Sequence, residues 1–321
     1  MKKEIKKVFD KLKTHIKNIW NIACKIHKKS GYLRIYILFD MLWSYIAYSV
    51  NYDEYYILSF YDVVSSERNT YLTHKKHKRI VRHLYNKKNL GVLNDSKKFY
   101  SKYKEFFNRE ISNINSISYK EYENIVLKNK KVMCISDTNK VKNSFENFDS
   151  SKFRSPAFML EKIKKDKLKY IEPYISGHKE LSKITDSVVS LNIVTLNIGS
   201  DVEVVSSSIS FNEGNKTYHG FIDSETATLK KNLICGEEVS DRVVEGIKIP
   251  LYDKACELAC ECAKEIKDVK EIEWNIFISS KKVYLIGASL WDDYIYYQMP
   301  EYNKIGLMPY YRIKLNDMRK I

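Results

Sequence analysis

The stretch that decides the fold is EIEWNIFISSKKVYLIGAS, residues 271–289. Apolar residues alternate with others along its first half, at Ile272, Trp274, Ile276 and Ile278. A period of two predicts a strand with one buried face. The polar turn at 279–282 precedes a second apolar run, so we expect a β-hairpin. The positions from which this hairpin would present polar groups hold Asn275, Gly287 and Ser289, and none of them is acidic.

Strands are also expected upstream of this hairpin. The runs at 187–199, 202–211 and 218–223 have the residue types and the spacing of paired strands. A helix is expected at 250–266, beginning at Pro250. Two shorter apolar runs, 131–136 and 167–175, mark the change from helices to strands, and 147–156 is the expected linker.

The N-terminal third is expected to be helical. Residues 2–29 carry apolar side chains at steps of three and four, with lysines on the other faces. Such a helix either lies on anionic lipid or packs its stripe on the domain behind it, and we favour packing. Residues 32–51 predict a buried helix, in which Arg34 and Asp40 argue against a membrane span.

Two further helices are expected before the first strands. One follows a capping signal at Ser65-Ser66 and continues through the basic stretch to residue 88, and the other covers 95–110. The fold class is therefore α+β. We expect an N-terminal helical region at 1–110, a small β-rich lobe at 111–167 and a large C-terminal lobe at 168–321.

Composition and charge narrow the functional classes. The chain has 321 residues, of which 44% are hydrophobic, so a sizeable core is expected. The net charge of +15 favours polyanions, among them anionic membrane and acidic glycans. Specific nucleic-acid recognition is poorly supported, because no RNA-binding or helix-turn-helix signature is present. No signal peptide or disulfide spacing is visible, so we expect a cytoplasmic protein, with the inner face of the membrane as an alternative.

Four local patterns occur in a specific order. They are residues 50–73, IEPYI with GHKEL close behind (171–181), DSVVSLNIVTL (186–196), and EWNIF followed by LIGAS (273–289). From about residue 40 to residue 292, the chain resembles the ATP-grasp superfamily. It is most similar to the sugar-transfer associated ATP-grasp proteins of bacterial surface-polysaccharide loci.

The resemblance implies an ATP-grasp-like architecture with a nucleotide between two β-rich lobes. Lysines would hold the phosphates of ATP, and acidic residues with an asparagine would hold Mg²⁺, since both cofactors need charged partners. The reaction implied is transfer through a phosphorylated carboxylate that an amine captures. A glycan precursor and polysaccharide-assembly enzymes are the implied partners.

Some nucleotide positions of this family are kept and others are replaced. Lys97 and Lys98 lie one or two places after the position of a phosphate lysine, and Cys134 stands where a second lysine would fall. Asn192 replaces an arginine that would meet phosphate. Glu172 falls where the strand between the lobes would meet adenine or ribose, and it is otherwise a solvated acid. His178 matches a polar family position, and it is otherwise a cap of the segment that follows.

The metal positions are replaced together. Asn275, Gly287 and Ser289 occupy the three family ligand positions, and two carboxylates and an amide are thereby lost. Asp292 and Asp293 follow closely and would be the ligands if the metal site had moved. Our hypothesis is a pseudoenzyme in which Mg-ATP catalysis is weakened or lost. The alternatives are an active ATP-dependent carboxylate–amine ligase with relocated ligands, and a basic peripheral protein that binds membrane or another polyanion.

Overall fold

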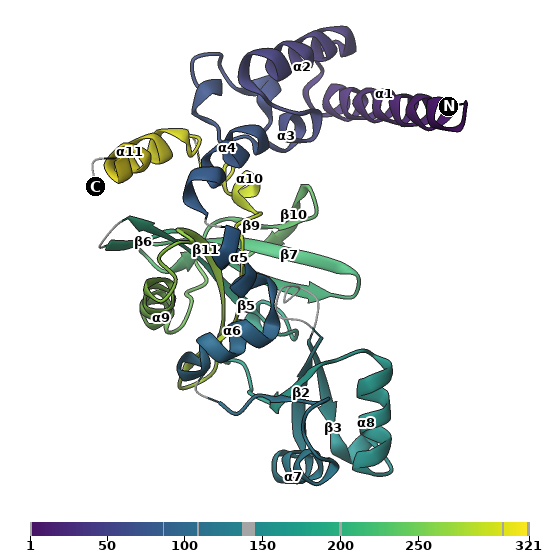
Figure 1. The fold of residues 1–321 in the computed structure, drawn as a ribbon. Coiled ribbons are helices and arrows are strands. Elements are labelled where there is room, and N and C mark those ends of the chain that lie inside the picture. The colour runs from purple at the N-terminus through teal and green to yellow at the C-terminus, as the bar shows by residue number, and fades with distance from the viewer. Residues whose placement is uncertain are drawn as a thin grey trace. The chain divides into compact units, whose positions relative to one another are not determined.

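A computed structural model of the chain describes residues 2–85, 87–107, 109–136, 145–198, 201–303 and 305–319. The chain forms two compact units. The first, the helical unit, contains Met1–His83 and Asp292–Ile321, and the second contains Leu84–Trp291. Figure 1 shows that the helical unit has no sheet among its described residues and that the second unit contains two. The expected α+β class, with helices first and two β-rich lobes after them, is confirmed.

The helical unit joins both ends of the chain. Its helices are α1 (Lys2–Ser30), α2 (Arg34–Tyr48), α3 (Tyr52–Ile57), α4 (His74–Leu84), α10 (Tyr294–Tyr297) and α11 (Met308–Arg319), with short 3-10 helices at Phe60–Asp62 and Arg68–Thr70. Gln298 holds the two ends together, because its side-chain amide bonds both the N–H and the carbonyl of Leu72. The C-terminal segment therefore packs with the helical unit, whereas the expected domains placed it in the large lobe.

Two expectations about this unit differ from the structure. Helix α4 begins at His74, and the hydroxyl of Thr73 accepts the Lys76 N–H at 3.4 Å, so the start signal is Thr73 and not Ser65-Ser66. The residues between instead form a turn that leads to a 3-10 helix. The expected buried helix at 32–51 exists as α2, but only one of its faces is buried. None of the described helices is long and apolar enough to cross a membrane.

The second unit begins with two helices and a small sheet. Helices α5 (Lys87–Asn94) and α6 (Ser96–Lys102) precede a 3-10 helix at Lys104–Phe106. The small sheet has the order β1-β4-β2-β3 and consists of β1 (Ser112–Asn113), β2 (Lys131–Ile135), β3 (Phe145–Asp149) and β4 (Tyr170–Pro173). Helices α7 (Tyr119–Asn129) and α8 (Pro156–Lys165) both contribute to the core on one of its faces. A second 3-10 helix lies at Ser150–Lys152.

The expected linker at 147–156 is wrong. Asn147 and Phe148 belong to β3, where they pair with Met133 and Val132 of β2, and the Phe148 side chain is buried. The turn-forming residues that suggested a linker make only the short connection from β3 to α8. The small sheet also includes β4, which begins three residues beyond the expected lobe boundary at 167.

The large sheet forms the rest of the second unit. Its order is β10-β9-β7-β6-β5-β11-β12, with β8 paired to β7. Its strands are β5 (Ser190–Ile198), β6 (Asp201–Glu213), β7 (Lys216–Asp223), β8 (Thr228–Leu229), β9 (Asn232–Cys235), β10 (Glu238–Val243), β11 (Glu271–Ile278) and β12 (Val283–Ser289). The predicted hairpin is β11 and β12, and the strands expected at 187–199, 202–211 and 218–223 are β5, β6 and β7.

The two faces of the large sheet differ in chemistry. Helix α9 (Tyr252–Lys264) packs against one face, where Ile272, Trp274 and Ile276 of β11 join its core (Figure 1). Alternation along the strands puts the intervening residues on the other face. We call this the polar face, and it is defined by Ser190, Asn192, Ser208, Ser210, Glu273 and Asn275, all of which are buried.

Candidate functional site

A cavity of about 460 Å³ opens where the small and large sheets meet in the second unit. Its wall includes Asn147 of β3, the connecting segment 174–178 that follows β4, and the adjoining ends of β5, β6 and β11. Half of the sixteen lining residues have polar side chains, among them Ser176, Ser182, Thr185, Ser187, Asn212 and the acidic Asp186. A cavity of this size and lining can hold a small polar molecule such as a nucleoside.

His178 is the one sequence-predicted cofactor residue in this cavity wall. Its backbone N–H donates to the Ile278 carbonyl at 3.0 Å, which fixes the segment to the end of β11. Its ring Nδ1 accepts the Glu180 N–H at 3.2 Å, so the neutral ring carries its proton on Nε2. The histidine thus caps the turn before the 3-10 helix Leu181–Lys183 while it borders the cavity. The structure thus shows the capping contact that the sequence offered as one alternative, and a role of His178 in cofactor binding stays a prediction.

Glu172 lies outside the cavity wall. Its side chain is fully buried and accepts a 2.5 Å hydrogen bond from Nε of Arg109. Burial raises the pKa of the Glu172 carboxyl by more than the neighbouring Arg109 lowers it. The alternative that Glu172 is a solvated acid is therefore wrong, because the carboxylate is buried against a cationic partner. Contact of Glu172 with adenine or ribose stays a prediction.

Arg109 links the small sheet to the large one and was not predicted from the sequence. Besides Glu172, it donates to the carbonyl of Leu285 on β12 at 2.7 Å and to that of Phe107 at 3.1 Å. Its guanidinium also lies over the rings of Phe107 and Tyr284. Nη2 of Arg109 and Oε1 of Glu172 are buried without a hydrogen-bond partner. No local pattern marks this arginine, because its partners are 63 and 176 residues away in sequence.

Residues that the resemblance places at charged family positions come together on the polar face. Asn275 of β11 pairs directly with Asn192 of β5 on one side and with Gly287 of β12 on the other. Ser289 pairs with Glu273, and its hydroxyl lies 3.5 Å from a Glu273 carboxylate oxygen. Directly paired residues of adjacent strands point to the same face. Positions from three separate strands therefore share one surface.

Asn192 is held by neutral partners. Its amide nitrogen donates to Ser210 at 2.9 Å, and its amide oxygen accepts from Ser190 at 3.1 Å. An arginine at this place would need a buried anion, and the described neighbours on β6 are hydroxyls instead. Asn275 differs, because its amide oxygen is buried and accepts no hydrogen bond.

The polar face offers few ligands for Mg²⁺. Glu273 is a buried carboxylate next to the expected positions, and Asn275 and Ser289 add one amide and one hydroxyl. Magnesium in proteins is usually held by one or two carboxylates with water and substrate phosphate. Within the described residues, no group of three or more His, Cys, Asp or Glu is placed to hold a metal ion. Asp292 and Asp293 belong to the helical unit, while the three replaced positions belong to the other unit.

The expected phosphate cations are not in the cavity wall. Lys97 and Lys98 are exposed on α6, where Lys98 lies 3.8 Å from Asp95. Cys134 faces the core of the small lobe with Phe148 and Ile171, and burial raises the pKa of its thiol. On the opposite face of β2, Met133 pairs with Glu172. Met133, and not Cys134, therefore holds the place from which a β2 side chain would reach toward the large sheet.

The chain has no match among protein-family models or among curated proteins. Among solved structures, the carboxyaminoimidazole ribonucleotide synthase of Aspergillus clavatus, complexed with ATP, aligns over 64% of this chain and 47% of its own, with a TM-score of 0.41 and 11% identity. The D-alanine-D-alanine ligase of Coxiella burnetii aligns over 74% and 59%, with a TM-score of 0.39 and 9% identity. The D-alanyl-alanine synthetase A of Vibrio cholerae aligns over 72% and 67%, with a TM-score of 0.44 and 10% identity. This chain thus matches about half of the length of the first of these, and values at this level assign it to no family.

Proposed function

We propose that the protein has an ATP-grasp architecture that keeps a nucleotide-sized cavity and has lost, or greatly weakened, Mg-ATP catalysis. The observation that carries this proposal is the row Asn192–Asn275–Gly287 across β5, β11 and β12. The resemblance assigned these positions, from distant parts of the sequence, to phosphate and metal. Their direct pairing in the sheet is what a shared phosphate and metal site would require, and it favours the proposed alignment.

The chemistry of the row favours a protein without phosphoryl transfer. A triphosphate needs cations and Mg²⁺ needs carboxylates to stabilise the charge that develops in the reaction. The row instead consists of two neutral amides and a glycine, with Glu273 as the neighbouring acid. The cavity wall, by contrast, combines short polar side chains with apolar and aromatic ones, a lining that suits a base and a sugar.

The wider role is proposed from the resemblance. A protein of this architecture in a surface-polysaccharide pathway would use the cavity to bind a nucleotide or a nucleotide-linked glycan precursor. It would then act by binding, as a partner of polysaccharide-assembly enzymes, and not by ligation.

A calorimetric and thermal-shift titration of the full chain with adenosine, ADP and ATP, with and without Mg²⁺, tests the proposal. We expect binding that does not depend on Mg²⁺. A ligand at about 100 times its Kd stabilises the folded state by roughly 2.7 kcal/mol, which such a scan detects. Tight binding that requires Mg²⁺ would contradict the loss of the metal site. The absence of binding for all three would contradict the retained cavity.

Two glycine variants give a matched comparison. A Cβ at Gly177 would meet only Phe277 Cζ, at 3.8 Å, so Gly177→Leu adds a side chain at the cavity wall without a backbone clash. A Cβ at Gly91 would have no neighbour within 4 Å, and Gly91 lies on α5, outside the cavity wall. Nucleotide binding should be lost in Gly177→Leu and kept in Gly91→Leu. Equal binding by both variants would place the nucleotide elsewhere.

A further inference from the structure

Helix α2 of the helical unit is apolar on two opposite sides. One side carries Ile37, Met41 and Ser44, which are buried, and the two apolar residues join the core formed with α1 and α3. The other side carries five large apolar residues, each between 56% and 66% exposed: Ile35, Phe39, Leu42, Trp43 and Ile46. We call these five residues the α2 outer face.

The α2 outer face is continuous. At 100° per residue, its five side chains fall within an arc of about 100° that lies opposite the buried side. The two charged residues of α2 lie outside this arc, and one of them, Asp40, is paired with Arg68. A row of five large apolar side chains without a charge is rarely left in water on a soluble monomer. An apolar side of a helix is normally covered, so a second surface is expected over the α2 outer face.

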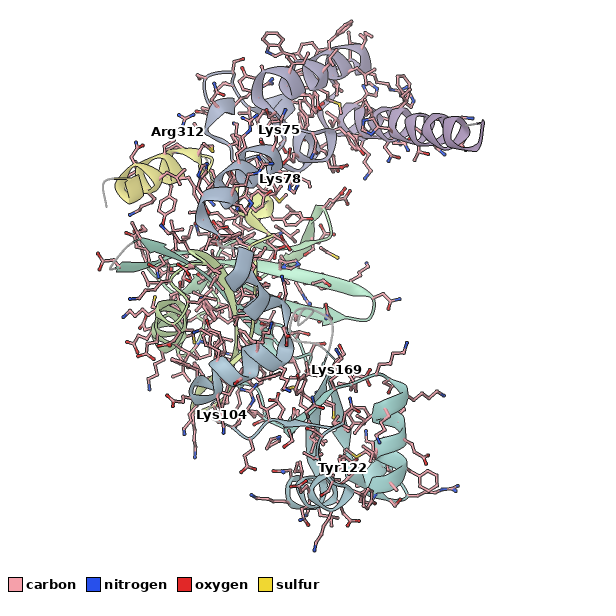
Figure 2. All side chains as sticks on the ribbon, viewed as in Figure 1. Lys75, Lys78, Lys104, Tyr122, Lys169 and Arg312 are labelled. Carbon is pink, nitrogen blue, oxygen red and sulfur yellow. The ribbon has the colours of Figure 1, made fainter. Side chains whose placement is uncertain are left out.

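The surroundings of this face are strongly basic. The guanidinium of Arg34 lies 5.9 Å from the ring of Trp20, and the ammonium of Lys75 lies 5.9 Å from the ring of Tyr45. Helix α4 contains no acidic residue, and Lys75 and Lys78 project from it (Figure 2). Helix α1 has ten lysines and two acidic residues in its sequence. Cations thus border the aromatic and aliphatic side chains within one unit.

This combination fits an anionic lipid surface better than a second copy of the chain. Aromatic rings with neighbouring Lys and Arg are typical of helices that lie in the headgroup region of a bilayer. With 15 residues, α2 is about 22 Å long, which is too short to cross the hydrocarbon core of about 30 Å. Two copies of such a basic unit would repel each other, whereas anionic headgroups attract it.

We propose that the α2 outer face inserts into the headgroup region of an anionic membrane, with α2 parallel to the surface and the lysines of α1 and α4 close to the lipid phosphates. From the sequence, the segments expected to face a membrane or another polyanion were residues 2–29 and the basic region 74–109. The structure instead assigns insertion to the helix that was expected to be buried. This proposal is independent of the nucleotide cavity, which lies in the other unit.

Co-sedimentation of the full chain with vesicles tests the proposal. The vesicles contain phosphatidylcholine alone or phosphatidylcholine with about 30% phosphatidylglycerol. We expect binding to the anionic vesicles, with a partition coefficient that falls steeply as salt rises, because exposed charges are screened. Binding that is equal for both vesicles and insensitive to salt would overturn the proposed role of the cations. The absence of binding to both would overturn the whole proposal.

A matched pair of phenylalanine variants locates the contact. Phe39, on the α2 outer face, is 66% exposed, and Phe158, on α8 of the other unit, is 52% exposed. Phe39→Ser should weaken partitioning roughly tenfold, because it removes one aromatic anchor, while Phe158→Ser should leave it unchanged. Both side chains are exposed, so both variants should fold. An equal effect of the two variants would overturn the assignment to α2.

Tryptophan fluorescence gives a second readout. Trp274 and Trp291 are buried, whereas Trp43 is 59% exposed on the proposed contact surface. Because Trp20 is also exposed, at 47%, the test uses a Trp20→Phe background. In that background, anionic vesicles should shift the emission to the blue, and Trp43→Phe should remove most of this shift. Sedimentation velocity without lipid tests the competing occupant. A dimer that Phe39→Ser converts to a monomer, together with no vesicle binding, would show that a second copy covers this face and would overturn the proposal.

Discussion

Asn192 and Asn275 lie directly opposite each other across β5 and β11, so two buried amides occupy the centre of the polar face. Asn192 has hydroxyl partners for its amide, whereas the amide oxygen of Asn275 accepts no hydrogen bond. The pair carries no charge. The two amides therefore add neither a carboxylate for a cation nor a cation for a phosphate, while the neighbouring Glu273 is a buried carboxylate.

A carboxyl at position 275 should reveal how costly a negative charge is on the polar face. Asn275→Asp places an acid in a buried site beside Glu273, and we expect a loss of about 2–4 kcal/mol in unfolding free energy at pH 8. Burial raises the folded-state pKa of the new carboxyl, so the penalty is absent at low pH and grows as pH rises through that pKa. Chemical denaturation at pH 5 and pH 8 measures it. Asn275→Leu, which keeps the branched shape of the side chain and removes its polar atoms, should change stability by less than about 1 kcal/mol.

A pH-independent loss in Asn275→Asp would contradict this account. It would mean that the new carboxyl reaches solvent, and that the polar face is open enough for an ion to enter.

Removing either partner of the Arg109–Glu172 ion pair should lower the stability of the protein, but by different amounts. Arg109→Met leaves the buried Glu172 carboxylate alone and should cost about 3–5 kcal/mol at pH 7. Glu172→Gln should lower the unfolding free energy by less, because the Arg109 guanidinium still donates hydrogen bonds to the carbonyls of Phe107 and Leu285. The double variant Arg109→Met with Glu172→Gln should recover most of the loss, because no charge is then left buried without a partner. Urea denaturation of all four proteins gives the coupling free energy.

The pH dependence of Arg109→Met has a defined sign. The Glu172 carboxyl has a raised pKa, so its contribution to stability is present below its ordinary value of 4.5 and is lost as pH rises through the folded-state pKa. Removing Arg109 raises that pKa further. The variant should therefore approach the stability of the wild type at acidic pH, and a constant difference at all pH values would exclude this explanation.

Arg68 predicts a large effect in the helical unit. Its guanidinium bonds both carboxylate oxygens of Asp40, at 2.7 and 2.9 Å, and also the carbonyls of Phe60 and Val63. Arg68→Met should destabilise the unit by about 3–5 kcal/mol, because Asp40 loses its buried partner. Arg68→Lys should also destabilise it, since an ammonium cannot reproduce the planar two-point contact. Thermal unfolding followed by circular dichroism checks both, with the exposed Lys75→Gln as a control. A stable Arg68→Lys would argue against this geometry.

Lys76 predicts an unusual titration. Burial, together with the nearby charge of Arg312 on α11 (Figure 2), lowers the pKa of the Lys76 ammonium from 10.5 to about 8. A lowered lysine pKa contributes stability above the unfolded value of 10.5 that is lost as pH falls through 8. Arg312→Gln should raise the pKa, and Arg312→Lys should leave it lowered. Carbon NMR of methylated lysines measures both shifts, and an unchanged pKa in Arg312→Gln would exclude the role of Arg312.

The sequence predicted the elements whose pattern is local. The alternation at Ile272, Trp274 and Ile276 indicated the hairpin, because burial of one sheet face repeats every second residue. The helix start at Thr73 was missed because Ser65-Ser66 offers the same capping chemistry a few residues earlier. The open side of α2 was missed for a different reason. An apolar pattern predicts that a helix surface will be buried, but it does not show whether the same chain or another molecule buries it.

The candidate site was predictable only in part. The replacement of charged residues at Asn192 and Asn275 can be read from the sequence once an alignment is granted, and their pairing follows from the register of β5 and β11. The ion pair of Arg109 with Glu172 could not be predicted from the sequence, because it joins residues that are far apart in the chain. The same holds for Met133, because the packing of α7 and α8 decides which side of β2 it faces.

The three-way contact of Arg109 has a mechanical consequence. One guanidinium holds the end of β4 through Glu172 and the edge of the large sheet through Leu285, directly beside the segment 174–178 that connects the two sheets. Contacts so close to the connecting segment should restrict rotation of one sheet relative to the other. The small and large sheets of the second unit should therefore keep a fixed spacing, so the cavity between them should be open in the free protein and should not form by closure of one lobe over the other.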